Sequence, residues 1–288
     1  MTPLPIGTVK RMTVLRKIDT GYVLEKEGQT ALLHHRETKE ELEENEEVDV
    51  FLYNDKKGNI AATAVIPKIQ RGIYDWAEVT NAISGLGVFV HIGIGKEMLV
   101  SADDLPPFER VWPKPNDKLY VTLGLDRRGR LLAIPATEHE MNRLFSPAPP
   151  EMLYQPVSGR IFRTSREGSV MITEENYRGF IHHTERKEEP RLGELVHGRI
   201  IDVKENGTIN VSLRPQKEKS MTDDAEAILR HLEKLNGVIP FDDRSDPEDI
   251  RATFGISKAA FKRALGKLMK EGKAEQRDGH TYLLEKKE

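Results

Sequence analysis

An internal repeat constrains the fold of this 288-residue chain more than any other feature. Residues 31–41 read ALLHHRETKEE, and residues 179–189 read GFIHHTERKEE. Both segments place apolar residues before a His-His pair, and both end in Lys-Glu-Glu. Because a repeated segment indicates a repeated structural unit, we expect at least two copies of one small domain.

Short β-rich runs flank both repeated segments in the same order. In each copy a run that begins with glycine precedes the His-His pair, and further runs follow it. The runs span 21–24, 48–52 and 58–61 in one copy, and 168–172, 195–203 and 207–213 in the other. Near-alternating apolar residues at this spacing predict a five-stranded barrel of about 60 residues.

A third, more divergent copy lies between these two. Its strand-like runs span 87–92, 98–101, 119–123 and 126–134. Gly58, Gly129 and Gly207 hold the last hairpin of the three copies, where glycine tolerates the positive φ that a tight turn needs. The sequence therefore predicts three consecutive barrels.

The remainder of the chain has a different pattern. From Thr222 onward the apolar residues recur with the period of a helix rather than that of a strand. Asp246, which precedes a proline, is typical of a helix start, and Gly255 is expected to end that helix. Ser257 is expected to cap a further helix, and residues 273–284 predict a hairpin with an Asp-Gly turn. Helices followed by a hairpin in this order resemble a winged helix.

The order of these motifs resembles the S1 motif of RNA-binding proteins, which adopts an OB-fold barrel. Three such repeats followed by a winged helix resemble the bacterial conserved virulence factor B family, over nearly the whole chain. The resemblance implies a non-catalytic protein that contacts single-stranded RNA through its barrels and winged helix. It also implies post-transcriptional regulation of gene expression, which in the family concerns virulence factors.

The predicted fold is thus mainly β with a C-terminal α+β domain: three tandem S1-type OB-fold barrels followed by a winged helix. A chain of this length exceeds what one hydrophobic core usually organises. The expected boundaries are 1–66 for the first barrel, 67–136 for the divergent second barrel, 137–150 for a linker with a short helix, 151–216 for the third barrel and 222–288 for the winged helix.

Composition limits how the chain could bind a polyanion. Lys and Arg number 44 against 47 Asp and Glu, and the pI is about 6.3. RNA binding would therefore need a local basic surface or base stacking rather than bulk positive charge. Cysteine is absent, which excludes disulfides and thiolate metal sites, and no apolar run suits a signal peptide or membrane span. We expect a cytoplasmic protein.

In the S1 family, RNA usually meets one barrel face that carries aromatic residues, a His, an Asp and an Arg. By position, the resemblance assigns six residues to this face: His34 and Asp55 in the first barrel, Phe89, Asp126 and Arg130 in the second, and His182 in the third. No copy has the full set, so the barrels are not expected to be interchangeable. Two alternatives stay open: the His residues could cap strand ends, and Phe89 could belong to the core.

Further candidates come from the third barrel and the C-terminal domain. Arg160 and Phe162 should face outward together, because they alternate with Ile161 on one strand. The other basic candidates for RNA contact are Arg178, Arg199, Lys204, Lys258, Lys262, Arg263, Lys267 and Arg277. The basic residues of the predicted helix after Ser257 could equally be a solvated face.

Signals for enzyme activity are weak. Residues 93–96, Gly-Ile-Gly-Lys, lack the full spacing of a phosphate loop and favour a hairpin turn. Neighbouring strand residues point to opposite faces, so the His-His pairs are not expected to share a metal ion. We expect no catalytic activity, no metal and no cofactor. Two alternatives to RNA binding are a winged-helix regulator that binds duplex DNA and a scaffold that binds a protein partner.

Overall fold

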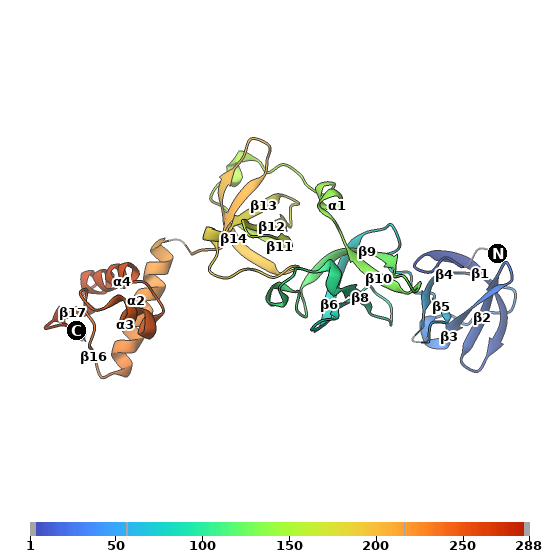
Figure 1. The fold of residues 1–288 in the computed structure, drawn as a ribbon, viewed down its shortest axis with the longest axis horizontal. Coiled ribbons are helices and arrows are strands. Elements are labelled where there is room, and N and C mark those ends of the chain that lie inside the picture. The colour runs from blue at the N-terminus through green and yellow to red at the C-terminus, as the bar shows by residue number, and fades with distance from the viewer. Residues whose placement is uncertain (1–3, 56, 216, 285–288) are drawn as a thin grey trace. The chain divides into compact units, whose positions relative to one another are not determined.

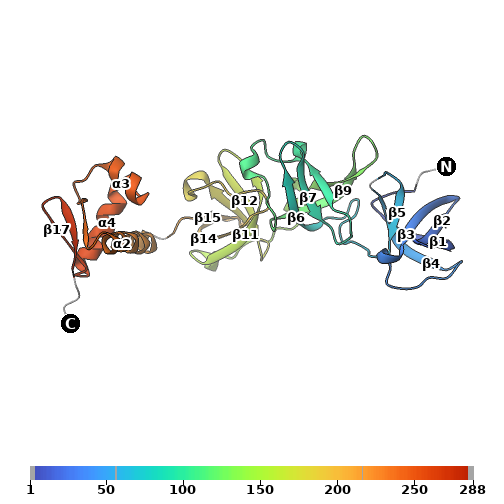
Figure 2. The same ribbon diagram turned by 90° about the horizontal axis from the view of Figure 1, so that it is seen from below.

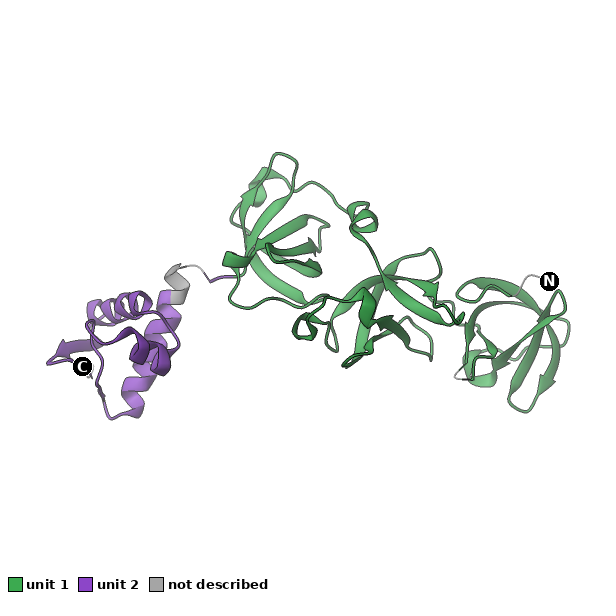
Figure 3. Cartoon of the chain, viewed as in Figure 1, with its two compact units in different colours: residues 1–213 green, residues 214–288 purple. Residues whose placement is uncertain are grey.

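The computed structural model describes residues 4–55, 57–215 and 217–284. The chain divides into two compact units, residues 1–213 and 214–288, which Figure 3 distinguishes by colour. The first unit contains the strands of three barrels, and the second contains three helices and a small sheet. Figure 1 labels most of these elements along the chain.

The first barrel is a closed five-stranded sheet. Neighbouring strands follow the order β1-β2-β3-β5-β4 around it, with β3 and β5 parallel and the other pairs antiparallel. The strands are β1 (Val9–Ile18), β2 (Gly21–Lys26), β3 (Gln29–His34), β4 (Glu47–Asn54) and β5 (Ile60–Thr63).

The third barrel repeats this topology. It is also closed, with the order β11-β12-β13-β15-β14 and one parallel pair, β13 with β15. The strands are β11 (Pro156–Thr164), β12 (Gly168–Thr173), β13 (Arg178–His182), β14 (Leu195–Val203) and β15 (Ile209–Ser212). The sequence repeat therefore corresponds to a structural repeat.

The second barrel is less regular. Its sheet has the order β10-β9-β6-β7-β8 and is open, although the edge strands β8 and β10 approach each other. A partly open five-stranded barrel is within the range of the OB fold. The strands are β6 (Asp75–Ile83), β7 (Gly87–His91), β8 (Met98–Ser101), β9 (Lys118–Leu125) and β10 (Leu131–Pro135).

One glycine position explains part of the repeat. Gly21, Gly87 and Gly168 each begin the second strand of their barrel. A Cβ atom added there would lie 2.0, 2.0 and 2.3 Å, respectively, from a backbone carbonyl oxygen of the next strand. Only glycine permits this approach, so the glycine that opens each β-rich run is required by packing.

The first strand of each barrel also bends at a matching place. The register shifts between Val14 and Arg16 in β1, between Val79 and Asn81 in β6, and between Ile161 and Arg163 in β11. Such bulges increase the local twist and let one strand follow the curvature of a small barrel.

The second unit has the helix and strand order of a winged helix. Its helices α2 and α4 pack against each other and against the strands β18 and β17, and Figures 1 and 2 label α2, α3, α4 and β17 in this unit. The side chains of Ile228, Leu232, Ile250, Phe261 and Leu265 form the centre of its core. The elements are α2 (Lys217–Lys234), β16 (Val238–Ile239), α3 (Pro247–Phe254), α4 (Lys258–Lys270), β17 (Ala274–Arg277) and β18 (His280–Leu283).

The local signals in this unit are confirmed. Asp246 caps α3 by accepting a hydrogen bond from the Glu248 backbone NH, and Gly255 ends that helix with φ +68°. Ser257 caps α4 through the Ala260 backbone NH. The sequence did not indicate the short strand β16, which pairs with β18, and α2 begins before the helical periodicity at Thr222.

Candidate nucleic-acid interface

The first histidine of each His-His pair caps a short turn. His34 ends β3, and its Nδ1 accepts a hydrogen bond from the Arg36 backbone NH at 3.5 Å. His182 ends β13 and accepts from the Thr184 backbone NH at 3.3 Å. His34 is half-buried and His182 is exposed. The capping role is therefore present in both barrels, while each ring still reaches the surface.

The two rings of the second pair lie close together. The expectation that neighbouring histidines point to opposite faces is therefore wrong for this pair. The ring centroids of His182 and His183 are 4.1 Å apart. The strand ends at His182, so the alternation of faces does not extend to the next residue. Among the described residues, no group of three or more metal-binding side chains gathers that could hold an ion.

In the second barrel, Phe89 lies on the outer face of β7. Its neighbours Val88 and Val90 are fully buried, whereas the Phe89 side chain is partly exposed and lies outside the core cluster. The ring is therefore placed where a base could stack. The alternative that Phe89 belongs to the core does not fit this position.

Asp126 and Arg130 form a pair in the last hairpin of the second barrel. Asp126 Oδ1 accepts hydrogen bonds from the backbone NH groups of Arg128 and Arg130, both at 2.8 Å, and Oδ2 accepts from Arg130 Nε at 2.7 Å. These hydrogen bonds, led by that from the Arg130 backbone, lower the pKa of Asp126. The Arg130 side chain remains 64% exposed and could meet a phosphate.

Arg160 and Phe162 lie on either side of buried Ile161 in β11, as the alternation predicts. Their surroundings differ. Arg160 Nη1 lies 3.4 Å from the backbone oxygen of Gly193, and the Phe162 ring packs against Phe145 at 5.8 Å between centroids.

A carboxylate in the linker helix neutralises two arginines of the third barrel. Glu138 begins α1 (Glu138–Asn142), and its Oε1 accepts a hydrogen bond from Arg178 Nη2 at 2.8 Å. Its other oxygen pairs with Arg163. The sequence predicted Arg178 as an RNA contact but did not indicate Glu138, which is distant along the chain and competes for the same charge.

The remaining candidates of the third barrel lie on β14 and just beyond it. Arg199 is half-buried, and its Nε atom is buried without a hydrogen-bond partner among the described residues. Lys204 is exposed at the start of the β14–β15 hairpin, where its backbone NH donates to Thr208.

The second and third barrels meet through the loop at 190–194. Arg191 donates two hydrogen bonds to Asp117, at 2.9 and 3.1 Å, and this contact raises the pKa of Arg191. The Lys118 backbone NH donates to the Gly193 oxygen at 3.1 Å, and the Leu192 NH donates to a backbone oxygen of the second barrel at 2.9 Å. Leu192 also joins the buried cluster of the first two barrels.

This contact creates a pocket of about 250 Å³, which we call the Trp76 pocket. Trp76 and Lys118 line it from the second barrel, and Arg160, Glu174 and Asn176 line it from the third. The Trp76 ring lies 5.3 Å from that of Tyr120. An aromatic ring thus shares one cavity with two cations and one carboxylate, and one of the cations, Arg160, is a predicted contact residue.

Sequence reasoning did not select Trp76 and Lys118. A signal for Trp76 exists, because Trp76 and Glu78 alternate with buried Ala77 and Val79, which places the indole on the outer face. Their proximity to Arg160 depends on docking between barrels, which no local pattern encodes.

The Gly-Ile-Gly-Lys segment at 93–96 packs between barrels. It connects β7 with β8, and Ile94 is buried in the cluster that the first two barrels share. Lys96 Nζ donates to the Asn54 backbone oxygen at 2.5 Å, and burial lowers the pKa of Lys96. These contacts give the segment a structural role.

In the winged helix, α4 carries four of the predicted contacts. Lys258 Nζ donates to the Arg244 backbone oxygen at 3.0 Å, and Lys262 pairs with Asp243 at 3.3 Å. Lys267 donates to Thr222 and lies 3.9 Å from Glu271. Arg263 is exposed and forms no hydrogen bond or ion pair with any residue that the structure describes.

The hairpin of the winged helix supplies the last candidate. Arg277 ends β17, and its guanidinium lies 4.8 Å from the ring centroid of Tyr282 on β18. Asp278 and Gly279 make the turn with φ values of +52° and +78°, as the Asp-Gly signal predicts. Arg277 is exposed next to this turn.

The part of the chain that the structure describes contains no helix that is long and apolar enough to cross a membrane. Four models of protein families match the chain, and together they follow the order of the domains. They are an S1 domain at residues 6–65, a CvfB first S1-like domain at 74–134, the second domain of virulence regulatory factor CvfB at 141–215, and a CvfB-like winged helix domain at 226–283.

Several relatives are similar over almost the full chain. The uncharacterized protein YitL of Bacillus subtilis is 46% identical over 276 residues, which cover 96% of this chain and 93% of the relative. Conserved virulence factor B of Staphylococcus aureus strain N315 is 35% identical over 270 residues, which cover 92% of this chain and 90% of the relative.

A solved structure is also similar. It is described as a multidomain protein with nucleic acid binding domains from Streptococcus pneumoniae. Its sequence is 36% identical, the TM-score is 0.67, and the match covers 97% of this chain and 98% of that one.

Proposed function

Because the chain belongs to the conserved virulence factor B family, we propose that it binds single-stranded RNA without catalysing a reaction and regulates gene expression post-transcriptionally in the cytoplasm. Its S1-type barrels and winged helix match the domain types of a pneumococcal relative that is described as having nucleic acid binding domains. The choice of single-stranded RNA rests on the chemistry of the barrel surface.

The observation that carries this proposal is the Trp76 pocket. An indole ring, the two cations Lys118 and Arg160 and the single carboxylate Glu174 line it, so positive charge is in excess. An aromatic ring with excess positive charge is the combination that binds a stacked base and its phosphate. A base inside a duplex cannot expose its face to such a ring, so a single strand is favoured. The S1-type barrels support RNA rather than DNA, because they resemble the S1 motif of RNA-binding proteins.

Several weak sites suit a chain with an acidic composition. The net charge is −3, so binding must come from local surfaces such as the exposed side of Phe89, the hairpin at Arg130 and the Trp76 pocket. Tethered weak sites gain affinity through their effective concentration, provided that one strand can reach them together.

The test is a fluorescence anisotropy titration with a labelled, unstructured single-stranded RNA. Trp76→Ala and Arg160→Gln should each weaken binding, whereas Tyr154→Ala and Lys39→Gln should not. Tyr154 and Lys39 are exposed residues outside the Trp76 pocket. Tyr154→Ala removes an aromatic ring, as Trp76→Ala does, and Lys39→Gln removes one positive charge, as Arg160→Gln does. Unchanged binding by both pocket variants would remove the argument for this site, and absence of binding by the wild-type protein would overturn the proposed function.

A second candidate function, binding of duplex DNA, is favoured by one observation. Arg263 is exposed on α4, and Arg277 is exposed beside the hairpin turn, the two elements with which a winged helix can meet a duplex. Under this alternative, Arg263→Gln with Arg277→Gln should abolish duplex binding and leave single-stranded RNA binding largely intact. Lys262 and Lys267 are less informative because they already have partners in the domain.

A further inference from the structure

We propose that a second pocket between the second and third barrels, the Phe108 pocket, binds one nucleotide of single-stranded RNA, with its base on Phe108 and its phosphate on Arg166. This inference rests on the proposed function and adds a binding site to it. The Phe108 pocket contains none of the residues that the family resemblance assigns, and it shares no lining residue with the Trp76 pocket.

The Phe108 pocket has a volume of about 450 Å³ and is built from both barrels. The second barrel contributes Phe108 and Arg110, which flank the start of η3 (Glu109–Val111). The third barrel contributes Ser165 and Arg166 from the β11–β12 loop, and Arg186 from the segment after β13.

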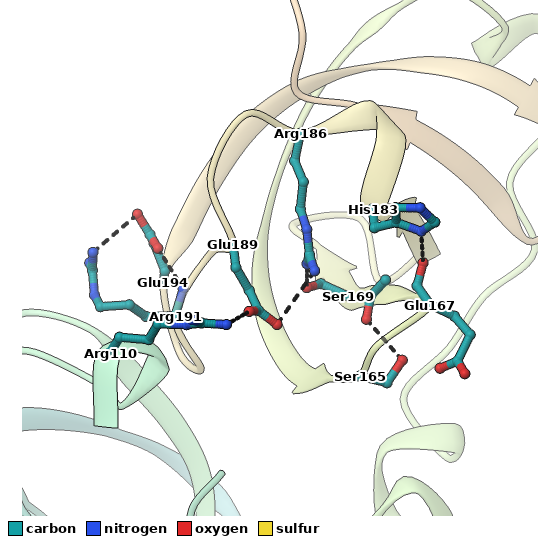
Figure 4. A network of polar contacts seen from close by, with 10 residues as sticks. Arg110, Ser165, Glu167, Ser169, His183, Arg186, Glu189, Arg191 and Glu194 are labelled. Carbon is teal, nitrogen blue, oxygen red and sulfur yellow. Dashed lines mark hydrogen bonds and ion pairs between the residues drawn. The ribbon is translucent and has the colours of Figure 1, made fainter. Parts of the chain in front are cut away.

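The charged side chains of the Phe108 pocket leave an excess of positive charge. Glu189 lies between two guanidinium groups, with Oε2 3.2 Å from Arg110 Nη2 and Oε1 3.4 Å from Arg186 Nη2, as Figure 4 shows. One carboxylate thus faces two cations, and Arg166 adds a third. The pocket therefore suits an anion.

The three arginines differ in how tightly they are held. The Arg186 side chain is only 8% exposed and donates a hydrogen bond to Ser169, so it forms a fixed wall. Arg166 is exposed and makes no hydrogen bond or ion pair with the residues that the structure describes. Arg166 is thus the group that can close on a phosphate without breaking a hydrogen bond or ion pair, while the carboxylate of its neighbour Glu167 attracts the same charge.

The ring of Phe108 completes the chemistry of a nucleotide. It is 63% exposed, and the guanidinium carbon of Arg110 lies 5.1 Å from its centroid. A stacked base would remove apolar ring surface from water and extend the ring–guanidinium stack. An acidic peptide would satisfy the arginines but would leave the ring uncovered, so the combination favours a nucleotide.

The contact between the barrels holds the two halves of the Phe108 pocket together. Arg110 and Glu189 come from different barrels, and their ion pair links the walls directly. The bidentate pair of Asp117 and Arg191 also joins the second barrel to the loop at 190–194 of the third. A pocket whose walls are already fixed loses less entropy when it binds.

The experiment compares Phe108→Ala and Arg166→Gln with the matched controls Tyr154→Ala and Lys39→Gln in the full-length chain. Binding of a labelled, unstructured, mixed-sequence RNA is measured at several salt concentrations. Phe108→Ala should weaken binding about fivefold or more, because one stacked base is lost, without changing the salt dependence. Arg166→Gln should weaken binding and reduce the slope of log K against log salt by about 0.7, the value for one phosphate contact on a single strand.

The outcomes separate this inference from the proposed function. If the wild-type protein binds RNA and both pocket variants bind like their controls, the Phe108 pocket is not an RNA site, while the proposed function stands. If Arg166→Gln weakens binding but Phe108→Ala does not, the assignment of a stacked nucleotide is overturned. If the wild-type protein binds no RNA at any salt concentration, both proposals fall together.

Discussion

Asp117 of the second barrel accepts two hydrogen bonds from the guanidinium of Arg191 in the third, at 2.9 and 3.1 Å. The side chains are 8% and 25% exposed, so the contact is largely shielded from water. It joins two barrels that each have their own sheet, and both proposed pockets are lined from the two sides of this joint. RNA binding and the docking of these barrels are therefore expected to depend on each other.

Arg191→Ala should destabilise the second barrel by about 1–3 kcal/mol, because the largely buried Asp117 loses both of its charge-assisted hydrogen bonds. The only tryptophans of the chain lie within the second barrel, Trp76 in β6 and Trp112 between η3 and β9, so intrinsic fluorescence during chemical denaturation reports on this part of the chain. Arg11→Ala is the control, because its pair with Asp49 is 63% and 50% exposed. If both variants lower the free energy of unfolding equally, the contact between Asp117 and Arg191 has no special role in stability.

Glu138→Gln should strengthen RNA binding. Glu138 pairs with Arg163 and Arg178, and removal of its charge makes both guanidinium groups available to phosphate. The affinity should rise and the salt dependence should become steeper, as measured by anisotropy titration. Glu151→Gln removes an exposed carboxylate with the same change in net charge. If Glu151→Gln strengthens binding equally, the effect is one of net charge alone.

Gly168→Ala should destabilise the third barrel by about 1–3 kcal/mol, since its Cβ would lie 2.3 Å from the Ile181 backbone oxygen and neighbouring strands would have to shift. Gly266→Ala is the matched control, because that glycine is helical and nothing lies within 4 Å of an added Cβ. The control should stabilise α4 by about 0.5–1 kcal/mol. Hydrogen exchange followed by mass spectrometry resolves the two units, and fast exchange in β12 is expected only for Gly168→Ala.

Acid should weaken the last hairpin of the second barrel. Hydrogen bonds, chiefly from the Arg130 backbone, lower the pKa of Asp126 below its ordinary value of 3.8. The stabilisation is therefore complete above that value and is lost as the pH falls through the lowered pKa of the folded state. Asp126→Asn should remove this part of the pH dependence of thermal unfolding as the pH falls below the ordinary value of 3.8. An identical acid profile for the variant and the wild type would show that the carboxylate does not titrate in this way.

Local patterns predicted much of the fold. The glycine at the start of each β-rich run is needed where the backbone of the next strand comes close. Gly21 and Gly168 therefore begin equivalent strands in their two barrels. Asp246 and Ser257 predicted their helices because a cap acts on the next turn of the chain. The open sheet of the second barrel and the strand β16 lacked such local signals.

The proposed sites were harder to predict, because they depend on contacts between distant segments. The alternation in β11 correctly placed Arg160 outward, yet it did not reveal that Trp76 lies in the same pocket. Likewise, the sequence identifies Arg178 as a basic residue, but it does not show that Glu138 neutralises its charge. Such pairings are decided by how the barrels and the linker pack.

The most direct test is a competition titration of the wild-type chain and Trp76→Ala with single-stranded RNA and with a DNA duplex of matching sequence. The wild type should bind the single-stranded RNA more tightly than the duplex, in a salt-dependent manner, and Trp76→Ala should reduce this preference about fivefold or more. A wild-type protein that prefers the duplex, or a preference that Trp76→Ala leaves unchanged, would contradict the claim that the junction of the second and third barrels binds single-stranded RNA.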